Sequence, residues 1–187
     1  MSETAQAEVT QLRVAEYAAL RRTIAARGTA RIVIAPVTCA LWASLTVILV
    51  LFGDVPLALL LPLAMLVGGF EAIHALHVGA ERIGRYLQVQ YEERQDGPRW
   101  ETTSMAVGPA LPGGGVDPLF SAVFAGAAVT NLLAALLVLA EPTLQEFAIL
   151  GVLHAAFVFR VVRARVAAAR QRAVELESFK ALLKRAN

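Results

Sequence analysis

Ionisable side chains cluster in a stretch of the chain that is otherwise apolar. The cluster consists of Glu71, His74, His77 and Glu81. These residues directly follow the apolar run at residues 56–70. An ionisable group at membrane depth is costly, so it usually has a partner and often a function. Carboxylates and imidazoles exchange protons and bind cations, which makes this cluster the candidate site for ion or proton handling.

Glu71 and His74 also have the Glu-x-x-His spacing of di-iron carboxylate bundles, in which side chains at i and i+3 point at one ion. Such bundles need a second copy of the motif and two further carboxylates. A dimer supplies the second copy by symmetry, whereas the further carboxylates are not evident in the sequence. The spacing makes a divalent metal a candidate cofactor and a metal-dependent membrane enzyme a candidate function.

The members of this cluster are expected at different depths in the membrane. Counted from Pro56 at about 1.5 Å per residue, Glu71 lies roughly 22 Å into a hydrocarbon core about 30 Å thick. His74 follows it by one turn, whereas His77 and Glu81 reach the inner interface. Glu71 and His74 are therefore the two residues that require an explanation.

Two polar residues on the last expected span are candidate partners of Glu71. His154 lies roughly 16–18 Å from the outer border of the last span, within a turn or two of the depth of Glu71. Arg160 lies near the inner end of the same span, and Asn131 lies nearer the outer border of the third span. We include His154 with Glu71 and His74 in the candidate site.

Three interpretations of the cluster remain open. In the first, Glu71 pairs with a nearby histidine or arginine and only fixes the register of the helices. In the second, the polar face handles protons or cations, and a homo-oligomer repeats it around an axis. The third is the metal centre.

We expect a channel-like or transport-associated protein. The alternative is a non-catalytic membrane scaffold that recruits a partner through its cytoplasmic helices, and an enzyme is not expected.

Four apolar blocks define the elements that position these residues. They are residues 32–52, 56–70, 118–140 and 142–159. A helix needs about 20 apolar residues to cross the hydrocarbon core, and the second block reaches this length only by including Glu71 and His74. The chain is 57% hydrophobic and 17% charged, whereas soluble domains have roughly 45–50% apolar and 25% charged residues. We predict an all-α polytopic membrane protein with four transmembrane helices.

The distribution of basic residues predicts the orientation. All 17 Lys and Arg residues fall within residues 1–31, 82–99 and 160–185, whereas the connections at 53–55 and 141–142 contain none. Under the positive-inside rule, both termini and the central loop are cytoplasmic, in a bacterial-type inner or plasma membrane. The basic residues then lie at the cytoplasmic border of the lipid bilayer, where they contact anionic head groups. The net charge of +2 therefore does not indicate nucleic-acid binding.

Helical sequence continues beyond the membrane at three places. Residues 1–31 form an amphipathic helix that Gly28 interrupts before the first span. The four-helix transmembrane domain covers residues 32–163 and includes an irregular cytoplasmic loop at 95–117, which is rich in proline and glycine. Residues 164–187 form a C-terminal cytoplasmic helix. Spans 2 and 4 therefore both have long cytoplasmic extensions.

Small residues on the spans favour close contacts between helices. One face of the second span carries Gly68, Ala72, Ala75 and Gly79. Small residues at this spacing let helices approach closely in lipid. We therefore expect a homo-oligomer, with a cytoplasmic protein as a further candidate partner.

Overall fold

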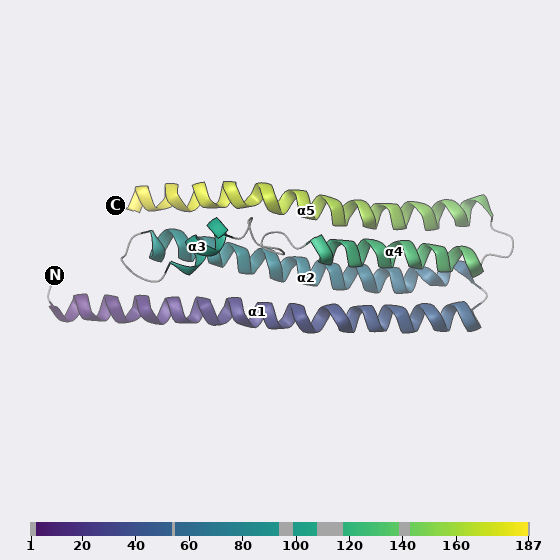
Figure 1. Ribbon diagram of the computed structural model, residues 1–187, viewed down its shortest axis with the longest axis horizontal. Helices are drawn as coiled ribbons and strands as arrows, with labels where there is room; N and C mark the ends of the chain where they lie inside the picture. Colours follow the sequence, from purple (N-terminus) through teal and green to yellow (C-terminus); the bar gives the residue numbers. More distant parts are fainter. Residues whose placement is uncertain (1–2, 54, 94–98, 108–117, 139–142, 187) are drawn as a thin grey trace. The chain divides into compact units, whose positions relative to one another are not determined.

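The computed structural model describes residues 3–53, 55–93, 99–107, 118–138 and 143–186 (Figure 1). Within these ranges the chain is helical apart from short connections, and it contains no strand. The elements are α1 (Glu3–Phe52), η1 (Pro56–Leu59), α2 (Leu60–Leu87), η2 (Gln88–Glu92), α3 (Trp100–Val107), α4 (Pro118–Val138) and α5 (Leu144–Ala186).

Four helical stretches in the described ranges are long and apolar enough to cross a membrane. They are Thr4–Phe52, Pro56–Glu92, Phe120–Val138 and Leu144–Arg185. The all-α class and the four helices of membrane-spanning length predicted from the sequence are thereby confirmed. Large apolar side chains remain exposed on each of them, Ile32, Leu61, Leu137 and Val152 among them. Exposed apolar surface of this kind is typical of contact with lipid.

α1 differs from the expected division into an N-terminal helix and a first span. It runs without interruption from Glu3 to Phe52, through both Gly28 and Pro36. The predicted interruption at Gly28 is therefore wrong. A single glycine within a helix costs only about 1 kcal/mol relative to alanine, and the long helical segments on either side of Gly28 outweigh that cost.

The helices that contain the second and fourth apolar blocks continue beyond those blocks, so the predicted helical continuations are present. α2 is α-helical to Leu87 and continues as one π-helical stretch, η2, to Glu92. α5 continues to Ala186. These continuations carry many of the charged residues of the chain.

The chain divides into two compact units. The apolar unit contains Arg31–Ala75 and Val116–Ala169. The charged unit contains Met1–Ala30, Leu76–Gly115 and Arg170–Asn187. α1, α2 and α5 each contribute residues to both units.

Aromatic side chains form the centre of the apolar unit. Phe70 of α2 is buried and forms T-shaped pairs with Phe124 of α4 and Phe157 of α5, with ring centroids 5.5 and 5.9 Å apart. Edge-to-face geometry is favourable for aromatic pairs. Ile73 and Val161 pack in the same core. Phe70 thereby packs α2 against both α4 and α5.

In the charged unit, α1 runs in the direction opposite to α2. Arg27 of α1 lies against Gly79 near the start of this part of α2. Further along α2, the hydroxyl of Tyr86 donates to Glu16 at 2.9 Å. Residue numbers therefore fall along α1 as they rise along α2. Gly79 allows this approach because the guanidinium of Arg27 occupies the space that a Cβ atom would fill.

α5 runs in the same direction as α2 within the charged unit. Arg172 donates to Glu81 at 3.2 Å, and Lys180 forms an ion pair with Glu93 at 3.0 Å. Residue numbers therefore rise together along the two helices. It follows that α1 and α5 are antiparallel within this unit.

Candidate functional site

Glu71 forms an ion pair with Arg160 at the surface of the apolar unit. The Nη2 group of Arg160 donates to Oε2 of Glu71 at 2.8 Å. The side chains of Glu71 and Arg160 are 41% and 42% exposed, although both residues lie on helices of membrane-spanning length. The pair joins α2 to α5, and much of its polar surface remains open to the surroundings of the unit.

Phe70 places the imidazole of His74 beside this ion pair. The rings of Phe70 and His74 are stacked on α2, with centroids 5.8 Å apart and planes inclined by 3°. The guanidinium carbon of Arg160 lies 5.8 Å from the centroid of the same Phe70 ring, a cation–π distance. His74 is half-buried and interacts electrostatically with both Glu71 and Arg160. We call Glu71, His74 and Arg160 the surface triad.

Asn131 of α4 is the centre of a second polar group, sealed inside the apolar unit. Its side chain is fully buried. Nδ2 donates to the carbonyl of Leu59 at 2.9 Å and lies 2.9 Å from Nε2 of His154. Oδ1 accepts a hydrogen bond from Nε1 of Trp42 and lies 3.1 Å from the hydroxyl of Thr46. We call these five residues the amide hub, which links α4 to α1, η1 and α5.

The hydrogen bonds of His154 define its tautomer. Nδ1 lies 2.7 Å from the backbone carbonyl of Leu150, which only accepts hydrogen bonds, so the network places a proton on Nδ1. Nε2 then accepts from Nδ2 of Asn131. His154 is therefore a neutral member of the amide hub and contacts Asn131. Glu71 instead forms its ion pair with Arg160. The surface triad and His154 belong to different polar groups.

The sequence did not single out Trp42, Thr46 or the backbone of Leu59 as members of a site. The available signal was Asn131, because an amide within an apolar span needs partners on neighbouring helices. The identity of those partners depends on how the helices pack, which the pattern of apolar blocks does not specify.

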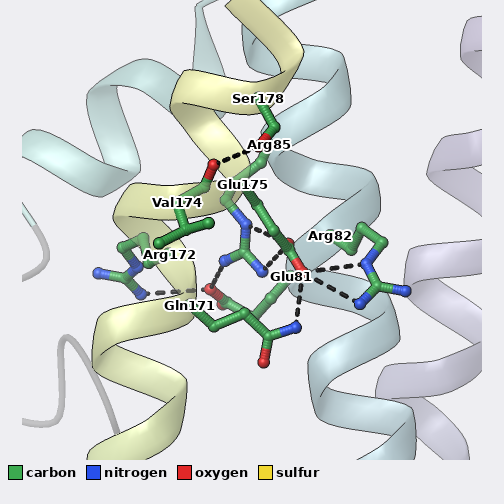
Figure 2. Close-up of polar contacts among 8 residues, drawn as sticks. All are labelled: Glu81, Arg82, Arg85, Gln171, Arg172, Val174, Glu175 and Ser178. Carbon is green, nitrogen blue, oxygen red and sulfur yellow. Dashed lines mark hydrogen bonds and ion pairs between the residues drawn. The ribbon is translucent and has the colours of Figure 1, made fainter.

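In the charged unit, Glu81 belongs to a network of ion pairs between α2 and α5 (Figure 2). Arg85, only 4% exposed, donates to Glu81 at 3.1 Å and to Glu175 at 2.6 and 2.9 Å. Arg172 also donates to Glu81, and Arg82 donates to Glu175. Glu81 is thus engaged by two arginines, which gives it a structural role in this unit.

Glu175 is the carboxylate at the centre of this network. Burial alone would raise the pKa of Glu175, but hydrogen bonds from Arg85, Gln171 and Arg82 outweigh burial and hold the pKa below its ordinary value. Glu175 is therefore charged at neutral pH, and its charge holds the network together.

α3 lies within the segment 95–117, which the sequence predicted to be irregular. The buried carboxylate of Glu92 accepts hydrogen bonds at 2.8 Å from the backbone N–H groups of Glu101 and Thr102, and from the Thr102 hydroxyl. Glu92 therefore caps α3 in the way that an N-cap residue does. The helix differs from the prediction because its cap comes from η2 rather than from the adjacent sequence. Apart from Arg99, the rest of the segment lies outside the described residues.

The attachment of α3 should weaken as the pH rises above about 4.5. Burial raises the pKa of Glu101 above its ordinary value of 4.5, and nearby Arg21 offsets this only in part. A raised pKa in the folded state means that the stabilising contribution is full below 4.5 and is lost as the pH rises through the folded-state pKa. The measurement is hydrogen–deuterium exchange at the Thr102 amide in the wild type and in Glu101→Gln.

The ratio of the two exchange rates cancels the intrinsic effect of pH on exchange. We expect a ratio near one at the acidic end of the range and faster exchange in the wild type above it. A ratio that does not change with pH would show that Glu101 does not couple proton binding to the attachment of α3.

The predicted cluster is divided between the two units. Glu71 and His74 belong to the apolar unit, whereas His77 and Glu81 belong to the charged unit, where His77 is half-buried on α2. Across the described ranges, no group of three or more His, Cys, Asp or Glu side chains is placed to hold a metal ion. Beside Glu71 and His74, the third member is the cation Arg160 rather than a third metal ligand.

No family model, no curated protein and no solved structure matches this chain.

Proposed function

We propose that this is an integral membrane protein of a bacterial-type inner or plasma membrane, with both termini and the central loop on the cytoplasmic side. The support is the distribution of basic residues, all of which lie within residues 1–31, 82–99 and 160–185. Basic residues concentrate on the cytoplasmic side of membrane proteins. In this orientation the charged unit is cytoplasmic.

Within this membrane protein, the surface triad handles protons in a homo-oligomeric, transport-associated assembly. The observation that carries the proposal is the half-exposed position of the triad on a unit with largely apolar surroundings. An ion pair that faces lipid is expensive, so we infer that water or another copy of the chain covers it. The amide hub, by comparison, is a sealed and neutral group of the kind that fixes helix packing.

The composition of the triad favours protons over metal cations. Arg160 holds a positive charge 2.8 Å from Glu71, and that charge repels a cation that approaches the same carboxylate. A carboxyl group and an imidazole are both able to donate and accept protons, and such side chains form proton relays in membrane proteins. A metal-dependent enzyme is not proposed, because among the residues that the structure describes no third metal ligand lies beside Glu71 and His74.

Glu71→Gln should reduce proton flux to the level of vesicles without protein. Glutamine keeps the size of the side chain and a hydrogen bond from Arg160, but it has no exchangeable carboxyl proton at this position. The measurement is the change in internal pH of proteoliposomes after a potassium diffusion potential is imposed. Glu146→Gln is the matched control, because Glu146 is a carboxylate of α5 that accepts from Thr143.

Equal proton flux in Glu71→Gln and Glu146→Gln would remove Glu71 from the proposed path. Proton flux at background in the wild type would contradict the proposal as a whole. Flux of Na⁺ or K⁺ that persists in Glu71→Gln would also contradict it, because the triad would then not control the conducted ion.

The second candidate function is a non-catalytic scaffold that recruits a cytoplasmic protein. The observation in its favour is Trp100, which is 63% exposed on a helix whose first turn is capped by the carboxylate of Glu92. Exposed tryptophan on a rigid element is typical of interaction sites. Trp100→Ser should then abolish binding of the partner and leave proton flux unchanged, whereas loss of both would indicate a general defect.

A further inference from the structure

α1 and α5 each expose a leucine toward the same end of the charged unit. Leu12 of α1 is 65% exposed, and Leu182 of α5 is 60% exposed. Nearly every side chain of α1 between residues 4 and 16 is exposed. At these exposures the two leucines do not cover one another, so both are open in a single copy of the chain.

The two leucines lie at nearly the same level along the helices of this unit. Tyr86 contacts both helices, because its hydroxyl donates to Glu16 at 2.9 Å and its ring centroid lies 5.8 Å from that of Phe179. Leu12 is four residues before Glu16, and Leu182 is three residues after Phe179. Since α1 and α5 are antiparallel here, both steps lead toward the same end of the unit, by about 4–6 Å.

The charges beyond the two leucines are complementary. Residues 3–12 contain two glutamates and no Lys or Arg, whereas residues 180–186 contain three basic residues and no acidic one. Counted from the same reference points, Glu8 lies within about a turn of the level of Lys184 and Arg185. Opposite charges at matching levels favour the contact in one register and disfavour shifted ones.

We propose that the occupant of this surface is a second copy of the chain, with α1 of one copy packed antiparallel against α5 of its neighbour. Leu12 meets Leu182, and Glu8 faces Lys184 and Arg185. Copies that insert in the same orientation keep their charged units at the same height, so each copy carries both halves of the contact. This inference rests on the membrane orientation proposed above and is independent of the proton chemistry of the triad.

Cysteine cross-linking between two differently tagged copies tests the contact. In a Cys39→Ser background, one copy carries Leu12→Cys and the other carries Leu182→Cys, and the pair is co-expressed and oxidised in membranes. A disulfide needs Cα atoms within about 7 Å. We expect a disulfide-linked product that contains both tags. No link can form within one copy, because each copy has a single cysteine.

The matched control pairs Leu12→Cys with Val174→Cys. Val174 is 62% exposed on α5, but it lies eight residues before Leu182, about 12 Å away along the helix. Cross-linking that is equal in the two pairs, or absent from both, overturns the proposal. Because the readout is cross-linked product, it is unaffected if the triad proves not to carry protons.

Charge reversal tests the register of the contact. Glu8→Lys on the Leu12→Cys copy should lower the yield of cross-linked product several-fold, and Arg185→Glu on the Leu182→Cys copy should restore it. Glu177→Lys on the Leu182→Cys copy is the control for a general effect of charge. A yield that is the same in all four combinations would overturn the pairing of Glu8 with the end of α5.

Discussion

Asn131→Leu should lower the free energy of unfolding by about 2–4 kcal/mol. Leucine has a similar size, but it leaves Trp42 Nε1, the Leu59 carbonyl and His154 Nε2 without the amide that they contact. Hydrogen bonds between membrane helices contribute about 0.6 kcal/mol on average and at most about 1.7 kcal/mol, and groups left buried without a partner cost about 1–3 kcal/mol. Equilibrium unfolding in mixed micelles of dodecylmaltoside and SDS measures the difference.

Thr130→Val is the matched control for this substitution. Thr130 precedes Asn131 on α4, is exposed, and donates to the carbonyl of Gly126 within its own helix. Its replacement breaks no bond between helices, so we expect a change of less than about 1 kcal/mol. If both variants unfold at the same SDS fraction as the wild type, the amide hub does not stabilise the apolar unit.

Arg85→Met should destabilise the charged unit by about 3 kcal/mol. Removal of one partner from a buried ion pair costs about 3–5 kcal/mol, because the remaining charge is left buried. We expect the lower end of this energy range, because Arg82 and Gln171 still donate to Glu175 after the substitution. Methionine keeps the length and the apolar part of the side chain. Hydrogen–deuterium exchange of the amides of α5 between residues 170 and 186 measures the loss of protection.

Arg82→Gln is the control for the loss of a positive charge on the same helix. Arg82 contacts the same carboxylate, but its side chain is 56% exposed, and exposed ion pairs contribute about 1 kcal/mol or less. Equal loss of protection in the two variants would mean that the burial of Arg85 adds nothing to its ion pairs.

The pH dependence of the Arg85 variant follows from the lowered pKa of Glu175. A carboxyl group with a lowered folded-state pKa contributes stability above its ordinary pKa of 4.5, and this contribution is lost as the pH falls through the folded-state value. The difference in protection between the wild type and Arg85→Met should therefore be full at neutral pH and shrink in acid below 4.5. A difference that persists unchanged in acid would show that packing, rather than charge, accounts for the role of Arg85.

The spans could be predicted from the sequence because apolar length decides them. The four blocks matched four helices of membrane-spanning length, and the helical continuations of α2 and α5 followed from residues that favour helix. Gly28 was misleading, because the cost of one glycine is small beside the stability of a fifty-residue helix. A single residue that disfavours helix therefore predicts a helix end only where the flanking sequence does not strongly favour helix.

The partners of the polar side chains could not be predicted in the same way. The candidate partners of Glu71 were His154, His74 and Arg160, and depth alone does not distinguish Arg160 from His154. The difference comes from rotation of the helices about their axes, which directs His154 toward Asn131 and Glu71 toward the surface. α3 was missed for a related reason, because its cap, Glu92, comes from a different element.

The amide hub also has a consequence for the order in which the chain is made. Its partners come from α1, η1 and α5, and the last of them to be synthesised is His154. Until α5 packs against α4, the amide of Asn131 lacks the acceptor that Nε2 of His154 supplies in the complete chain. A partly synthesised bundle therefore differs from the finished one by a polar group that lacks one hydrogen-bond partner, and a buried donor without a partner costs about 1–3 kcal/mol.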